Sequence, residues 1–127
     1  MPSWFNEGIA SLNEKSSFKN DELTGQFSWR IISLRNALSN NSYTGLRQLM
    51  ESNDDELYGK RSSFYYAQAR YLLMNLQKKG LLYDYYKSFR DTYAKDNTGI
   101  SQIEAVWGKN LDEIDNEYLQ YIRSFEE

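Results

Sequence analysis

The sequence predicts an all-α fold, a compact multi-helix domain with a long antiparallel helical hairpin. Apolar residues recur at helical spacing along most of the chain, no segment alternates apolar and polar residues long enough to form a strand, and the one proline is at position 2. A chain of 127 residues, 40% of them hydrophobic, can bury one core. Residues 1–127 are therefore interpreted as a single helical domain.

The first predicted helix covers residues 3–15 of the opening stretch MPSWFNEGIASLNEK. Pro2 suits a first turn, because its missing N–H would be unpaired there, and Ser3 can cap the helix. An apolar stripe follows at i, i+4 and i+7: Phe5, Ile9 and Leu12. Gly8 is not needed for this stripe and costs ~1 kcal/mol relative to Ala in mid-helix. Its presence suggests that something approaches the helix closely there.

Two shorter helices are expected next, after a polar connection that contains Gly25. Ser28 can cap the first, whose expected buried face is Trp29, Ile31, Ile32, Leu34 and Leu38. The second begins at Ser42, with apolar residues at helical spacing: Tyr43, Leu46, Leu49 and Met50. The segment SNDDELYGKRSS that follows is interpreted as a loop.

The longest predicted helix covers residues 62–79, and its core side is expected to be Ala69, Leu72, Leu73 and Leu76. Gly80 suits the position just after a helix end. A second long helix is predicted over residues 81–94, with the inward side chains Leu82, Tyr85, Tyr86, Phe89 and Tyr93. The short connection KKGLL predicts that these two helices form the antiparallel hairpin.

Two further helices complete the prediction. The first covers residues 98–107 and is closed by Gly108. The second begins after Asn110, which forms a capping-box pattern with Glu113, and carries an apolar face of Leu111, Ile114, Tyr118, Tyr121 and Ile122.

The composition excludes several classes of function. The chain has no histidine and no cysteine, so it has no Ser/His/Asp triad, no histidine base and no Cys-ligated zinc. Its net charge is −3 and its basic residues are scattered, which argues against a nucleic-acid partner. No apolar run approaches the ~20 residues that cross a bilayer, so no membrane span is expected. Carboxylate, lysine or tyrosine chemistry remains, or a role that is not catalytic.

Three conspicuous features have sufficient structural explanations. Most of the eleven tyrosines are expected to bury a ring and keep the hydroxyl at the surface. The NDDE cluster at 53–56 lacks the spacing and glycine of a calcium loop. The acidic run DEIDNE at 112–117 favours the positive end of a helix dipole.

The opening motif has no such explanation. PSWFNEGIA resembles the P-x-W-x-x-E-G-x-A segment of gluzincin metallopeptidases, particularly the peptidase-MA-like group, where it follows the zinc-binding helix. The downstream order is also similar: a polar connection, short helices, a longer helix with Tyr-x-x-A, a Trp-Gly and a final amphipathic helix. The resemblance covers essentially the whole chain, although its specific part is about nine residues long.

The resemblance implies a role for each matching residue. Glu7 matches the third zinc ligand, and Tyr66 or Tyr65, depending on the frame, matches a tyrosine that stabilises the tetrahedral intermediate. The remaining matches are packing residues at the site: Gly8 and Ala10 against the zinc-binding helix, and Pro2 and Trp4 where this helix begins. The fold would then resemble the C-terminal subdomain of a zincin, supplying one wall of the peptide cleft.

The chain departs from the family because it lacks H-E-x-x-H, which supplies two zinc ligands and the general base. The resemblance therefore implies a truncated or diverged half, not an enzyme as an isolated chain. Zinc and a peptide substrate are expected only together with the missing N-terminal catalytic half. That half would be the natural partner. Without it, Trp4, Phe5 and an uncovered face around Glu7, Gly8 and Ile9 would favour self-association.

Other interpretations stay open. A non-enzymatic helical interaction module would receive a partner helix or peptide on an exposed aromatic surface. A carboxylate-based enzyme would need two carboxylates ~5–9 Å apart across a cleft, which sequence spacing cannot reveal. The PSWFNEGIA match would then be an amphipathic helix and nothing more.

Overall fold

The computed structural model describes residues 1–15 and 31–124, and within these ranges the chain forms helices and no strand. The all-α prediction is confirmed for this part of the chain. The helices are α1 (Ser3–Lys15), residues 31–39, α3 (Leu46–Met50), α4 (Asp54–Leu57), α5 (Ser62–Lys78), α6 (Leu82–Thr92), α7 (Ile100–Trp107) and α8 (Leu111–Arg123). None of these described helices is long and apolar enough to span a bilayer.

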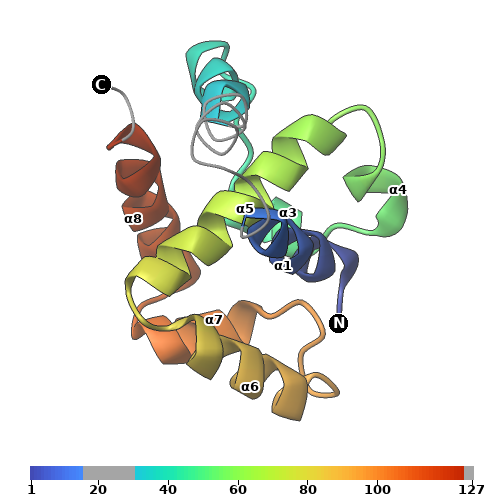
Figure 1. The fold of residues 1–127 in the computed structure, drawn as a ribbon, viewed down its shortest axis with the longest axis vertical. Helices are drawn as coiled ribbons and strands as arrows, with labels where there is room; N and C mark the ends of the chain where they lie inside the picture. Colours follow the sequence, from blue (N-terminus) through green and yellow to red (C-terminus); the bar gives the residue numbers. More distant parts are fainter. Residues whose placement is uncertain (16–30, 125–127) are drawn as a thin grey trace.

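Helix α5 is the centre of the fold, and α1, α3, α4, α6 and α8 all pack against it. Figure 1 shows α5 crossing the middle of the molecule, with α4 near its first turns and α6 and α7 beyond its last. The predicted core side is confirmed, because Ala69, Leu72, Leu73 and Leu76 are fully buried. Burial extends around most of α5, as expected for a helix surrounded by others.

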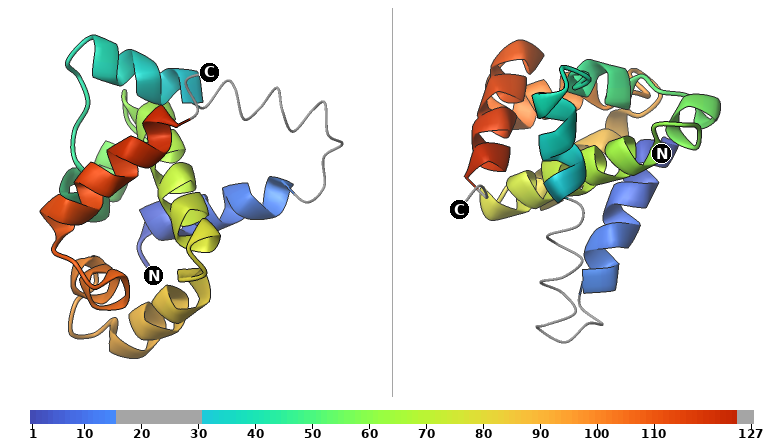
Figure 2. Two further views of the ribbon diagram at one scale, coloured as in Figure 1. Left: turned by 90° about the vertical axis from the view of Figure 1, so that its left-hand side faces the viewer. Right: turned by 90° about the horizontal axis from the view of Figure 1, so that it is seen from above.

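The turn after α5 is a Schellman motif. Gly80 has φ +75°, and its N–H bonds the Gln77 carbonyl at 3.0 Å, while Leu81 N–H bonds the Leu76 carbonyl at 2.8 Å. Helix α5 ends just before Gly80 as predicted, but α6 contacts α7 more extensively than it contacts α5, so the predicted hairpin is not the main packing of either helix. The most extensive partner of α5 is α1, which crosses it in Figure 2.

Helix α4 corrects the prediction of a loop over the NDDE cluster. The Asn53 side chain accepts from Glu56 N–H, and the Glu56 side chain accepts from Asn53 N–H, which is a complete capping box. The same motif, predicted at Asn110 and Glu113, is confirmed at the start of α8. The first motif was missed because a four-residue helix has no room for an apolar period.

The other boundaries largely agree with the prediction. Helix α1 covers residues 3–15, although Ser3 lies in its first turn, and α7 ends at the left-handed Gly108. Helix α3 begins at Leu46 instead of Ser42, because Gly45 is extended and forms its N-cap. The predicted polar connection over residues 16–27 and the Ser28 and Trp29 assignments lie outside the described residues.

Some predicted core residues are exposed. On α6, Tyr85 and Phe89 are fully buried, but Tyr86 and Tyr93 are 39% and 37% exposed. Ile32 is also exposed, whereas its neighbours Ile31 and Leu34 are buried. In each case the predicted buried face of the helix was wider than the observed one, because a helix of a small domain contacts its neighbours along a narrow stripe.

Candidate functional site

Gly8 is the point of close approach between α1 and α5. A Cβ at this position would lie 2.6 Å from Leu73 Cδ1 and 3.4 Å from the Ala69 carbonyl oxygen. The close contact expected at Gly8 exists, but its partner is α5 of this chain. Gly8 is buried there, so the expectation that it belongs to an uncovered face with Glu7 and Ile9 was wrong. In this packing the buried face of α1 consists of Trp4, Phe5, Gly8 and Ser11, whereas Ile9 and Leu12 are half-buried. The predicted buried stripe of Phe5, Ile9 and Leu12 was therefore displaced around the helix axis.

Trp4 and Phe5 are part of the core, with only 1% and 2% of their surface exposed. The Phe5 ring packs edge-on against Tyr85 and Phe89 of α6 at centroid distances of 5.9 and 5.5 Å. Trp4 stacks on Phe89 at 6.4 Å. The expectation that these two aromatics would be partly uncovered was wrong, because α6 covers them.

Arg70 anchors the second half of α1. This α5 side chain is 1% exposed, and its Nη1 donates to the Ser11 carbonyl at 2.6 Å. A charged hydrogen bond in a buried place is among the stronger ones in a protein. Helix α1 is thus held to α5 both by apolar packing and by this bond, which positions the side chains on its two flanks.

The first flank carries Glu7 and faces α4 and the start of α5. We refer to Ser3, Glu7, Asp54, Tyr58 and Tyr66 as the acidic flank. Tyr58 hydroxyl donates to Glu7 Oε2 at 2.8 Å, and Ser3 hydroxyl donates to Asp54 Oδ1 at 2.6 Å. The Tyr58 and Tyr66 rings meet edge to face at 6.1 Å. Residues from three helices therefore converge around one half-exposed carboxylate.

The two candidate tyrosines differ in position. The pKa of Tyr66 is raised, first by burial and then by the negative charge of Glu7. Tyr65 is buried instead and packs its ring against Phe64 at 5.5 Å. Of the two frames left open by the sequence, the one that begins at Tyr66 places its tyrosine on the flank of Glu7, where its ring meets that of Tyr58.

Tyr58 was not singled out in the sequence. Its hydrogen bond to Glu7, and then burial, raise the pKa of its phenol above the ordinary value of 10.0. The two residues are 51 positions apart, and Tyr58 follows a segment that had been interpreted as a loop. No local sequence signal could have identified this contact, because it depends on where α4 packs.

A zinc ion fits the acidic flank only in part. Within residues 1–15 and 31–124 no group of three or more His, Cys, Asp or Glu side chains is arranged to hold a metal ion. Protein zinc sites use three or four ligands, so Glu7 offers one oxygen donor toward such a site. Of the other matched residues, Pro2 accepts the first N–H bonds of α1 and Ala10 is exposed.

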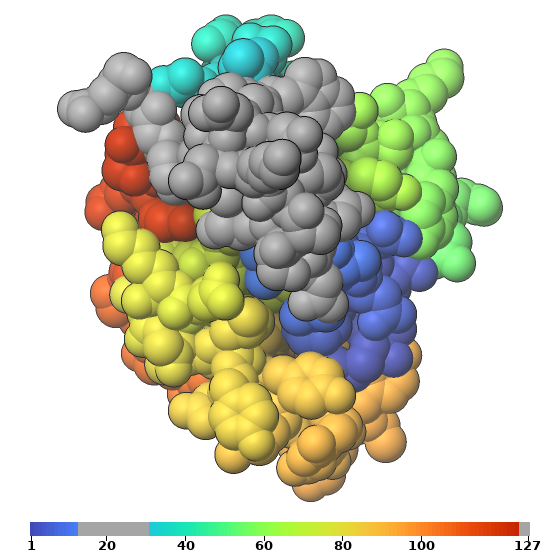
Figure 3. Space-filling model, viewed as in Figure 1, coloured from blue at the N-terminus to red at the C-terminus, as the bar shows by residue number. Residues whose placement is uncertain are grey.

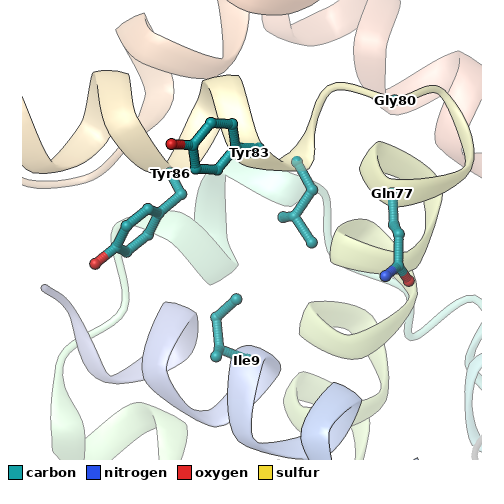
Figure 4. A pocket seen from close by; sticks show the side chains of 6 residues that line it. Ile9, Gln77, Gly80, Tyr83 and Tyr86 are labelled. Atoms are coloured by element: carbon teal, nitrogen blue, oxygen red, sulfur yellow. The ribbon is translucent and has the colours of Figure 1, made fainter.

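The second flank of α1 borders a shallow groove of about 430 Å³, which we call the aromatic groove. Its lining is mostly apolar: Ile9, Gln77, Gly80, Leu82, Tyr83 and Tyr86. Figure 4 shows Ile9 reaching from α1 toward Tyr86, with Gln77 and Gly80 along the other edge. Tyr83 is 69% exposed, and Lys87 Nζ lies 4.5 Å from the centre of its ring.

Another carboxylate, Asp115 of the DEIDNE run, has a structural role. It accepts from Tyr43 hydroxyl at 2.9 Å, and burial raises the pKa of this aspartate. A Cβ on Gly45 would lie 2.9 Å from Asp115 Oδ2, so α8 and the start of α3 are in direct contact. This cluster ties α8 to α3.

No family model, curated protein or solved structure matches this chain. The geometry of the two flanks of α1 and the residues of the opening motif therefore carry the functional argument.

Proposed function

We propose that this chain is the helical C-terminal part of a gluzincin-like zinc metallopeptidase and is not catalytic alone. It supplies Glu7 as the third zinc ligand and one wall of the peptide cleft. The proposal is supported by the acidic flank, where Glu7 of the E-G-x-A motif is half-exposed and Tyr66 of the Tyr-x-x-A motif packs edge to face on Tyr58, the phenol that donates to Glu7. Two motifs far apart in the sequence thus lie on one surface, which supports the proposal.

The packing of α1 supports this role. A metal ligand must be held in place by its helix, and α1 is fixed to α5 through Gly8 and through the Arg70 bond to Ser11. The Glu7 side chain is nevertheless accessible, because Gly8 and Trp4, not Glu7, face the core. In Figure 3 α1 is seen at the surface between α4 and α6.

The remaining groups of the site come from the H-E-x-x-H half. When bound, zinc in such enzymes polarises a water molecule and the substrate carbonyl. In this chain, Glu7 would bind through a carboxylate oxygen, and the Tyr66 hydroxyl would be a further donor on the same flank. That hydroxyl is protonated at neutral pH, because the ordinary pKa of a tyrosine is 10.0 and burial raises the pKa of Tyr66 further.

The first test is the coding sequence upstream of Met1. An H-E-x-x-H motif a few tens of residues before Pro2 is expected. The purified longer protein should then bind one zinc ion, and Glu7→Gln should weaken zinc binding. Asp55→Asn, which removes a neighbouring exposed carboxylate on α4, is the matched control and should leave zinc binding unchanged. The absence of the motif, or equal zinc affinity in Glu7→Gln, would refute the proposal.

A second candidate function rests on the aromatic groove. An apolar floor with exposed Tyr83 and Tyr86 fits the apolar face of an amphipathic helix. Two cations border this groove: Lys87 Nζ lies 4.5 Å from the centre of the Tyr83 ring, and the Arg90 guanidinium lies 5.7 Å from the centre of the Tyr86 ring. The groove is therefore suited to an acidic amphipathic helix, which makes this chain an interaction module.

This alternative is tested with two fluorescent amphipathic helical peptides that share an apolar face and differ in the sign of their charge. Anisotropy should rise with the acidic peptide, and the change should be lost in Tyr83→Ala/Tyr86→Ala. Tyr93→Ala, which changes an exposed tyrosine at the C-cap of α6 and outside the groove, is the control. Equal binding of both peptides, or none, would exclude a charge-selective docking groove.

A further inference from the structure

A second pocket, of about 260 Å³, is formed by the helix of residues 31–39, the connection after it and the beginning of α5. Its lining is mostly polar and includes Ser33, Asn36, Asn40, Lys60, Arg61 and Ser63. Lys60 and Arg61 provide two positive charges, and among the described residues that line the pocket none is acidic. The first turn of α5 contains no acidic residue either. The pocket is therefore a local concentration of positive charge in a chain whose net charge is −3.

Arg61 is held in place by groups that do not neutralise its charge. Its Nη1 donates to Thr44 Oγ1 at 3.2 Å, and its Nη2 donates to the Ser42 carbonyl. The guanidinium also lies 4.3 Å from the centre of the Phe64 ring. Within the part of the chain that the structure describes, Arg61 has no carboxylate partner. A guanidinium has five N–H donors, so this side chain can still donate to a further acceptor.

The other groups of the pocket complement Arg61. Lys60 is exposed, and it forms no ion pair with any described residue. The serine hydroxyls and asparagine amides are neutral hydrogen-bond donors. A phosphate monoester carries a charge of about −1.5 to −2 at neutral pH and has three acceptor oxygens. Two cations surrounded by neutral donors match such a group, whereas a single carboxylate would leave one cation uncompensated.

We propose that this pocket binds the phosphate monoester group of a small soluble molecule. The Arg61 guanidinium donates to the phosphate oxygens, and Lys60 supplies the second positive charge. The pocket is slightly smaller than the ~300–1,000 Å³ typical of sites for drug-sized ligands, which fits a phosphate on a short carbon skeleton. It shares no residue with the acidic flank or the aromatic groove, so this proposal is independent of the zinc role of Glu7.

The first experiment titrates the 127-residue chain with glycerol 2-phosphate, replacing sodium chloride so that the ionic strength stays constant. Backbone amide NMR shifts of residues 33–42 and 60–64 are expected to change and to saturate. Lys60→Gln should raise the Kd about 2–5-fold, as for an exposed charge pair, and Arg61→Gln about 10-fold or more, as for a charged hydrogen bond. Lys95→Gln removes the same charge at an exposed site in the turn after α6 and should leave the Kd unchanged.

The thermal midpoint of each variant is measured as well, because Arg61 also holds the Ser42 carbonyl. If Arg61→Gln does not fold, the exposed Lys60 decides the result. Shifts that stay linear and never saturate, or the same Kd in wild type and Lys60→Gln, overturn the proposal.

A second experiment tests whether the phosphate belongs to a lipid headgroup instead. The chain is sedimented with phosphatidylcholine vesicles that contain phosphatidic acid, which carries the same monoester group on a membrane. No cosedimentation is expected. Binding to these vesicles without binding of glycerol 2-phosphate would overturn the assignment to a soluble molecule.

Discussion

The two flanks of α1 are built from the same helix and have opposite chemistry. Glu7 and Ile9 are two positions apart, which separates them by about 200° around a helix. The acidic flank joins its groups by hydrogen bonds, such as the one from Tyr58 to Glu7. The aromatic groove presents the rings of Tyr83 and Tyr86, which carry cations above them. One surface is suited to a metal or another polar ligand, and the other to an apolar partner.

The residue between them explains how both flanks remain accessible. Gly8 faces α5, and its missing side chain lets the two helix backbones approach closely. The flanking side chains are then neither fully buried nor fully exposed. A small residue at a helix crossing thus determines what its neighbours present to the solvent.

Phe5→Ala should disrupt both flanks together. The ring lies within 6.2 Å, centre to centre, of Tyr85, Tyr86 and Phe89, so its removal leaves a cavity between α1 and α6. The free energy of unfolding is expected to fall by about 3–5 kcal/mol, measured by urea denaturation followed by circular dichroism. A loss below about 1 kcal/mol would show that α1 is not part of the cooperative core. Leu12→Ala, at a half-buried position, should cost less.

Gly8→Val should separate α1 from α5. Its branched side chain would meet Leu73 and the Ala69 carbonyl, and overpacking of this kind costs about 1–3 kcal/mol. Gly8→Ala should be milder, because the ~1 kcal/mol gain in helix propensity offsets part of the displacement of Leu73. Denaturation of the two variants against Ala10→Val, at an exposed site, checks the order. If Gly8→Val is as stable as wild type, the close helix crossing is not required.

Tyr86→Ala should affect the aromatic groove alone. The Tyr86 ring stacks on Phe5 at 6.2 Å and 19°, and an aromatic pair of this kind contributes about 0.5–1.5 kcal/mol. Tyr83→Ala, at a more exposed site, should change stability by no more than about 0.5 kcal/mol. Both midpoints are read from thermal melts. Similar losses for the two variants would mean that Tyr83 is also packed.

Glu7→Gln should alter only the acidic flank. The Tyr58 phenol is expected to titrate above its ordinary value of 10.0 in wild type, because the hydrogen bond to Glu7 favours the protonated form. The stabilisation from this pair is present below the unfolded pKa and is lost as the pH rises through the raised folded pKa. In Glu7→Gln the pKa of Tyr58 should fall toward 10, as monitored by NMR of the ring. An unchanged titration would contradict the hydrogen bond, and Asp55→Asn is the control.

The sequence predicted well where a signal is local. The core side of α5 follows from its apolar spacing, the turn at Gly80 from the need for a positive φ, and the start of α8 from Asn110 and Glu113. The sequence predicted burial poorly where it depends on which other helix packs against a residue. The inward face of α6 was drawn too wide, because spacing does not show that Tyr86 lies at the edge of its contact with α1.

At the candidate site, too, the sequence identified residues with a local signal and missed contacts made by packing. The opening motif singled out Glu7 and suggested that Gly8 is a close contact, but it left the frame of Tyr65 and Tyr66 open and gave no indication of Tyr58. These contacts depend on the crossing of α1, α4 and α5, which join residues 51 positions apart.

Local sequence signals were sufficient for the helical class, for the helix ends that have caps or glycines, and for the presence of a carboxylate in a Gly-containing helix. The tertiary structure alone decided which helix fills the space beside Gly8, which tyrosines reach Glu7, and that Trp4 and Phe5 are buried. The physical reason is the range of the forces involved. Helix propensity and capping act within four residues along the chain, whereas burial and side-chain hydrogen bonds depend on neighbours that folding brings together.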